Sequence, residues 1–129
     1  MARKATVRSR VPGARRGASA TVVPIADRLD RLVGGLGNNQ VAELLDVSRS
    51  QPSRWRKSQE GMGPENQRRV LDLDYVMSRL LQLYPLDQAH VWLRSDNAHL
   101  GARPVDVLRV RGVGPVIEAI DAEAEGAYA

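Results

Sequence analysis

Four basic side chains surround a single tryptophan in the segment VAELLDVSRSQPSRWRKS, residues 41–58. They are Arg49, Arg54, Arg56 and Lys57, and no acidic residue lies between Asp46 and Glu60. A solvated helix usually mixes both signs of charge, so an acid-free basic stretch favours an anionic partner. Arginine pairs bidentately with guanine and binds phosphate oxygens, which is the chemistry of nucleic-acid recognition. The segment therefore predicts a DNA-binding surface.

The spacing within this segment is typical of a helix-turn-helix unit, whose second helix enters the major groove with its N-terminal half. We expect Pro52 and Trp55 to point toward the core. The residues that then point away, and could contact bases, are Arg49, Ser50, Ser53 and Arg54. Arg56 and Lys57 suit phosphates, as do the polar side chains that start the preceding helix, Asn38, Asn39 and Gln40. A solvated helical hairpin without DNA is the alternative.

Patterns for catalysis or metal binding are weak. Asp72 and Asp74 diverge on an expected helix and form no acid–base pair. His90 and His99 lie nine positions apart and the chain has no cysteine, so a metal site is disfavoured. The GGLG segment at 34–37 follows no strand and precedes no lysine, which indicates a helix stop rather than a phosphate loop. We expect no enzymatic activity, no cofactor and no metal.

The basic residues are concentrated at the N-terminus. Residues 1–20 contain six bases and no acid, whereas the rest of the chain contains 13 bases and 15 acids. A leader rich in Ala, Ser, Gly, Val and Pro cannot build a core. It is predicted to be a disordered solubilising segment, a basic arm on DNA phosphates or an organelle transit segment.

Helical periodicity accounts for the N-terminal half of the remaining chain. A stripe from Ile25 to Leu36 predicts a first helix, which Gly34, Gly35 and Gly37 would end. Asn38 or Asn39 would cap the next helix, and Ser48 or Ser50 the third. Val41, Ala42 and Leu45 are expected to pack inward, with Val47 filling the turn.

A long helix is predicted from about Glu65 to Tyr84, ended by Pro85. Besides its main apolar stripe it carries a second strip, Leu71, Val76 and Leu83. Two strips suggest contacts on two sides, so we expect this helix to help form a homodimer or to contact another partner.

The C-terminal region is predicted to contain a short helix from Leu86 to Leu93, a loop, and two further helices starting near Pro104 and Pro115. Leu93, Leu100, Pro104, Val107 and Leu108 could form a small core of their own, and Gly126 would break the last helix. With no strand pattern, we predict an all-α fold. Its modules are a leader (1–20), a helix-turn-helix module (21–62), a connecting helix (63–85) and a helical C-terminal module (86–129). No apolar run is long enough for a transmembrane helix and no secretory pattern is seen, so a cytoplasmic protein without a membrane partner is expected.

Ordered motifs in the C-terminal region resemble the toxin-binding domain of the Xre/MbcA/ParS antitoxins, most closely the mycobacterial MbcA branch. They are Trp92-Leu93, Asn97 to Leu100, Pro104 to Leu108 and Val116 to Ile120, and the resemblance covers about residues 25–129. The basic leader does not belong to the family pattern, and Pro52 replaces its aliphatic residue in the recognition helix.

The resemblance implies an antitoxin of a type II toxin–antitoxin system, with a DNA-binding helix-turn-helix that autoregulates its operon. Its partner would be a RES-domain toxin that degrades NAD, whose active site the C-terminal domain would cover. The implied toxin-binding residues are Trp92, Arg94, Asn97, Leu100, Arg103, Glu118, Glu125 and Tyr128. Tyr128 near the C-terminus would be the candidate plug of the NAD entrance. A stand-alone helix-turn-helix repressor and a structural adaptor are the alternative functions.

Overall fold

Apolar side chains at helical spacing produce seven helices and no strand in the part of the chain that the structure, a computed structural model, describes, residues 23–127. This confirms the all-α prediction. The expected leader and Tyr128 lie outside the described residues. In chain order the helices are α2 (Ile25–Leu36), α3 (Asn38–Leu45), α4 (Gln51–Arg56), α5 (Pro64–Leu80), α6 (Leu86–Arg94), α7 (Pro104–Arg111) and α8 (Val113–Ala127). None of these helices is long and apolar enough to cross a lipid bilayer.

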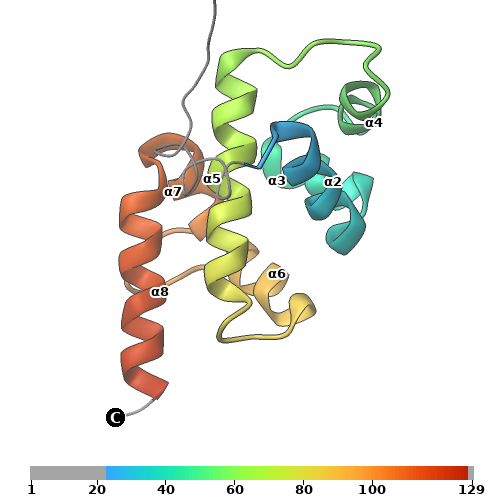
Figure 1. The fold of residues 1–129 in the computed structure, drawn as a ribbon. Helices are drawn as coiled ribbons and strands as arrows, with labels where there is room; N and C mark the ends of the chain where they lie inside the picture. Colours follow the sequence, from blue (N-terminus) through green and yellow to red (C-terminus); the bar gives the residue numbers. More distant parts are fainter. Residues whose placement is uncertain (1–22, 128–129) are drawn as a thin grey trace, which may run out of the picture.

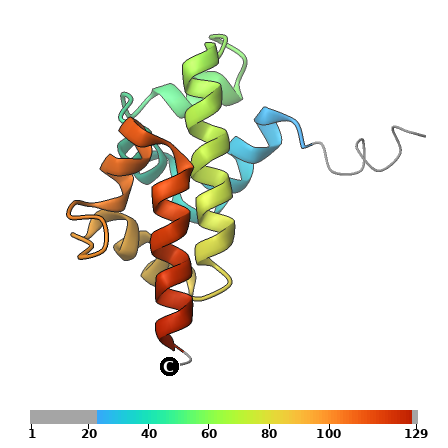
Figure 2. The same ribbon diagram turned by 90° about the vertical axis from the view of Figure 1, so that its left-hand side faces the viewer.

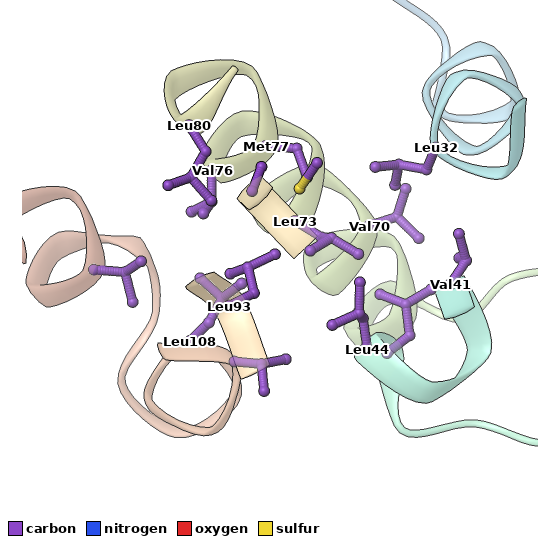
Figure 3. Close-up of a cluster of buried hydrophobic side chains, with 14 of the residues drawn as sticks. Leu32, Val41, Leu44, Val70, Leu73, Val76, Met77, Leu80, Leu93 and Leu108 are labelled. Carbon is purple, nitrogen blue, oxygen red and sulfur yellow. The ribbon is translucent and has the colours of Figure 1, made fainter. Parts of the chain in front are cut away.

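Helix α5 is the central column of the molecule. It contacts α2 and α3 on one side and α7 and α8 on the other, and α8 runs beside it in the same direction (Figures 1 and 2). Figure 3 shows Val70 of α5 next to Leu32 and Val41, whereas Val76 and Leu80 are directed away from them. Both sides of α5 are therefore buried within one chain.

This arrangement corrects the interpretation of the second apolar strip. Val76 is fully buried and Leu83 packs against the same core, while Leu71 stays 40% exposed. The strip exists mainly because α5 lies between two groups of helices of its own chain. The prediction that the second strip contacts a partner chain is therefore wrong at Val76. The homodimer itself stays a prediction.

The C-terminal segment has no separate core. Leu93, Val107 and Leu108 belong to the same buried cluster as Leu29 and Leu44 of the N-terminal helices. Arg109 of α7 strengthens this connection, because its guanidinium donates to the backbone oxygens of Glu43 (2.8 Å) and Leu44 (3.3 Å) at the end of α3. Such cations satisfy carbonyls that have no partner within the helix.

A buried carboxylate fastens α2 to α5. Asp74 is only 4% exposed and accepts hydrogen bonds from Arg28 (2.9 Å) and from two nitrogens of Arg31 (2.7 and 3.1 Å). Hydrogen bonding to Asp74, and its charge, raise the pKa of the Arg31 guanidinium. The expected divergence of Asp72 and Asp74 is confirmed, since Asp72 pairs with Arg68 instead.

Two helices continue through glycines that were expected to end them. Helix α2 continues through Gly34 and Gly35 and ends only before Gly37, whose φ of 88° favours glycine. Gly126 does not break α8, which reaches Ala127. In both helices the cost of glycine, about 1 kcal/mol per residue, is small beside the stability of a packed or alanine-rich helix.

The remaining differences concern caps and the end of the long helix. Gly37, not Asn38 or Asn39, is the N-cap of α3. Ser50 is the N-cap of α4 as predicted, but neither helix has a side-chain cap hydrogen bond. Helix α5 ends at Leu80 rather than Tyr84, because Pro85 disfavours a helical conformation at Tyr84. Residues 81–84 form a turn instead, and this turn places the Tyr84 hydroxyl next to α8.

Candidate functional site

Helices α3 and α4 form a tight helix–turn–helix pair. Asp46 adopts a left-handed conformation (φ 59°, ψ 49°), and the Val47 amide donates to the Ala42 carbonyl at 3.0 Å. Aspartate tolerates this conformation better than most residues. Pro52 and Trp55 of α4 are buried as predicted, so the polar face of α4 points outward.

The four bases around Trp55 are not equally available. Arg49 and Lys57 are exposed, and neither has an acidic partner within residues 23–127. Arg56 pairs with Asp30 of α2 at 2.8 Å. Arg54 donates to Ser50, Gln51 and Glu60, the last at 3.2 Å, because the turn after α4 brings Glu60 back toward it. Arg54 would have to exchange these contacts to reach a base or phosphate.

The other residues predicted to contact DNA differ in their exposure to solvent. Asn38 and Ser50 are exposed, whereas Gln40 and Ser53 are half-buried. The Gln40 side-chain oxygen is buried and has no hydrogen-bond partner among the described residues. The exposed bases without an acidic partner are therefore Arg49 and Lys57, and the exposed Ser50 follows Arg49 directly.

A second polar site lies at the far end of the molecule, near the C-terminal end of α8 (Figures 1 and 2). Here the Glu123 carboxylate accepts hydrogen bonds from the Tyr84 hydroxyl (3.1 Å) and from the Trp92 indole nitrogen (3.3 Å). The turn after α5 brings Tyr84 to this position. Burial and the bond to Glu123 raise the pKa of the Tyr84 hydroxyl, so it stays a donor at neutral pH.

Two shallow depressions meet at Tyr84. The first, which we call the Glu123 groove, has a volume of about 460 Å³ and is lined by Tyr84, Asn97, Ala98, His99, Ala119, Ala122, Glu123 and Gly126. The second, the Trp92 hollow, has about 420 Å³ and is lined by Tyr84, Asp87, Gln88, Val91, Trp92 and Ser95. Tyr84 is the residue that lines both, and we call the two together the concave surface over α6, the loop after it and α8.

Of the residues predicted to bind a partner here, Trp92 and Asn97 border this concave surface. Glu118 and Glu125 are exposed on the outer side of α8. Tyr84 and Glu123 were not singled out from the sequence. Helical spacing gives no reason to separate Tyr84 from the apolar residues of the long helix, or Glu123 from the other acids near the C-terminus.

Arg94 and Arg103 lie apart from the Glu123 groove and are engaged within the chain. Arg94 pairs with Glu43 of α3 at 2.7 Å, and Arg103 forms two hydrogen bonds to Asp106, at 2.8 and 3.1 Å. Hydrogen bonding to Arg103 lowers the pKa of Asp106, against the effect of desolvation. Arg94 connects α6 to α3, whereas Arg103 pairs within the first turn of α7, so a partner would meet both arginines already paired.

Asn97 and Leu100 organise the loop between α6 and α7. The Asn97 side-chain oxygen accepts a hydrogen bond from the Leu100 backbone N–H at 3.0 Å. The backbone N–H of Asn97 donates to the Ala102 carbonyl, also at 3.0 Å. Leu100 packs against the core. The Asn-x-x-Leu motif therefore shapes the wall of the groove.

The candidate metal ligands among residues 23–127 are dispersed. No three His, Cys, Asp or Glu side chains gather there in a way that could hold a metal ion. The half-buried His90 has its pKa lowered by burial and by the charge of Arg94.

Comparisons with known proteins agree with a binding role. No protein-family model matches the chain. It is 33% identical over 113 residues to the mycobacterial cidal antitoxin MbcA of Mycobacterium bovis and of Mycobacterium tuberculosis, which covers 87% of this chain and 98% of those proteins. Among solved structures, a chain of the M. tuberculosis MbcT–MbcA toxin–antitoxin complex superposes with a TM-score of 0.66 and 32% identity, covering 81% of this chain and 97% of that one.

Proposed function

This chain belongs to the family of the mycobacterial antitoxin MbcA, and from that premise we propose that it is the antitoxin of a type II toxin–antitoxin system. The observation that carries the proposal is the match over nearly the whole length of MbcA, together with the same fold in a chain of a toxin–antitoxin complex. The partner we propose is a RES-domain toxin that degrades NAD, which the antitoxin holds inactive. This role requires no catalysis by the antitoxin.

Co-expression tests the pairing directly. The chain is produced together with a tagged product of the adjoining gene, and the growth of the host and the composition of the purified material are measured. We expect the toxin alone to stop growth, and the pair to restore growth and co-purify. If the tagged toxin purifies alone and growth stays arrested in the presence of this chain, the antitoxin function is rejected.

We propose that the C-terminal module supplies the toxin contact, through the Glu123 groove, Trp92, Asn97 and the acidic outer side of α8. Tyr128 lies just beyond the described end of α8 and is the proposed plug of the NAD entrance. Because α8 includes Gly126 and Ala127, a clean test removes only residues 128–129. We expect that complex to stay assembled and to regain part of its NAD-consuming activity. A truncated complex that is intact and fully silent would place the inhibition elsewhere in the C-terminal module.

We further propose that the helix-turn-helix binds the operator of its own operon. The support is the pair of exposed bases on either side of α4, Arg49 before it and Lys57 after it, which remain without acidic partners in the described structure. Replacing Arg49 by alanine should weaken operator binding by about 1–3 kcal/mol if it reads a base, and should also relax sequence preference. Removing residues 1–20 should instead weaken binding to all sequences and flatten its salt dependence.

The matched control for the DNA claim is Arg68→Ala, since Arg68 is an exposed arginine on α5 that pairs with Asp72 away from α4. It should bind the operator like the wild type. If neither the free chain nor its toxin complex binds its promoter, the regulatory proposal fails while the antitoxin proposal stands. A chain that binds DNA but no toxin would support the alternative, a stand-alone repressor.

A homodimer within the complex is proposed from the exposed apolar side chains of α5 and the turn after it. Leu71, Tyr75 and Leu81 are 40%, 45% and 47% exposed. Leu81→Glu avoids the buried core and should lower the mass of the species in solution if a second copy covers this surface. An unchanged mass for the free chain and the complex would reject Leu81 as part of an interface.

A further inference from the structure

Hydrogen bonds connect the Glu123 groove to the Trp92 hollow at their common border, which is Tyr84. One carboxylate, Glu123, lies between two aromatic side chains and is held by a neutral donor from each, Tyr84 and Trp92. We infer that this surface binds an arginine side chain of the protein partner. The inference rests on the proposed function, since it specifies which chemistry of the toxin the site recognises.

Charge is the first argument. No arginine or lysine lines either depression, whereas Asp87 and Glu123 do. Residues 86–127 contain four bases and seven acids. Three of those bases are already in ion pairs: Arg94 with Glu43, and Arg103 and Arg109 with Asp106. The negative charge of the concave surface is therefore uncompensated by any cation of the described chain.

The hydrogen bonding of Glu123 is the second argument. A carboxylate offers about four lone-pair sites, and the two neutral donors use two of them. Asp121, two residues earlier on the same helix, is different, because it already pairs with Arg79 of α5. Glu123 is thus held in position and keeps capacity for a forked donor such as a guanidinium.

The shape and apolar surfaces of the site supply the third argument. A guanidinium stacks on aromatic faces, and Trp is the best partner in such cation–π contacts. Val91 in the Trp92 hollow is 60% exposed and can cover the aliphatic part of an arginine. On α8 the groove is lined by Ala119, Ala122 and Gly126, and a Cβ added at Gly126 would meet nothing within 4 Å. A partner backbone can therefore approach α8 closely.

The test compares three variants in complex with the co-expressed toxin. Glu123→Gln keeps an acceptor for Tyr84 or Trp92 and removes the charge. Trp92→Phe keeps a ring and removes the indole. Glu65→Gln, at an exposed glutamate in the first turn of α5 that lines neither depression, is the matched control. Dissociation constants are measured by calorimetry at three salt concentrations, and thermal unfolding of each free variant reports on its fold.

We expect Glu123→Gln to weaken toxin binding about tenfold to a hundredfold and to reduce its salt dependence, as loss of a buried charge contact does. Trp92→Phe should weaken binding by a smaller factor, and Glu65→Gln should bind within about twofold of the wild type, as expected for an exposed charge outside the interface. If the complex forms and Glu123→Gln binds with wild-type affinity and salt dependence, the inference is overturned and the antitoxin function stands.

A second measurement is independent of the toxin. The chain contains two tryptophans, and Trp55 is buried in α4 at the other end of the molecule. In titrations with a capped Gly-Arg-Arg-Gly peptide, the indole N–H resonance of Trp92 should shift saturably and that of Trp55 should not. The shift should vanish in Glu123→Gln. An unshifted Trp92, or equal shifts of both indoles, would overturn the inference even if the wild-type chain bound no toxin.

Discussion

Replacing the buried Asp74 by asparagine tests how the helix-turn-helix is fixed to the central helix. The Asp74 side chain is 6% exposed, and its three hydrogen bonds come from the guanidinium groups of Arg28 and Arg31 of α2. Asparagine removes the negative charge and presents an N–H group to one of these donors. The change therefore replaces attraction by a donor–donor contact.

The magnitude follows from burial. Removing one partner of a buried ion pair costs about 3–5 kcal/mol, because the remaining charge is left unpaired. Here the side chains of Arg28 and Arg31 are 23% and 58% exposed, so both can regain water. We therefore expect a smaller loss of about 2–3 kcal/mol in the free energy of unfolding. For a domain of this size that corresponds to roughly 10 °C in melting temperature.

The assay is urea unfolding followed by far-ultraviolet circular dichroism, with Asp30→Asn as the control. Asp30 also pairs with an arginine, Arg56, but both side chains are well exposed, so its loss should cost less than about 1 kcal/mol. If Asp74→Asn is no more destabilising than Asp30→Asn, the carboxylate does not fasten α2 to α5 in the way described.

Three further outcomes are expected. Burial lowers the pKa of His90 in the folded chain, so the stability that the neutral imidazole contributes is present above the unfolded pKa of histidine and is lost as the pH falls below it. His90→Gln should flatten the stability–pH curve in that pH range, and an unchanged curve would contradict this. Arg109→Ala should cost about 1–2 kcal/mol and speed amide exchange in α3, whose last carbonyls it binds; unchanged exchange would argue against that contact. Gly126→Ala should stabilise the free chain by up to about 1 kcal/mol, since Gly126 is helical and a Cβ there meets nothing; a lower melting temperature would contradict the helical assignment.

Helical periodicity predicted most of the fold because it reports directly on which side of a helix is buried. The stripes around Leu29, Leu73 and Leu93 lie in the core as expected, and Pro52 and Trp55 anchor α4. Periodicity does not state which neighbour covers a stripe. The second strip of α5 was therefore assigned to a partner chain, although Val76 is covered by the chain itself.

The helix ends and caps were harder to predict because they depend on energies of about 1 kcal/mol that tertiary packing overrides. Gly34 and Gly126 remain helical for this reason. The candidate site could be predicted from the sequence only in part, because tertiary packing brings its residues together. Tyr84, Trp92 and Glu123 belong to three different elements, and nothing in their sequence separation indicates that they meet.

The central proposal is that this chain silences an NAD-degrading toxin. The direct measurement is the rate of NAD loss in a reaction that contains the purified toxin of the adjoining gene, while increasing amounts of this chain are added. We predict that the rate falls with each addition and reaches zero when the toxin is saturated. A rate of NAD loss that is unchanged at a saturating excess of the folded chain would contradict the account.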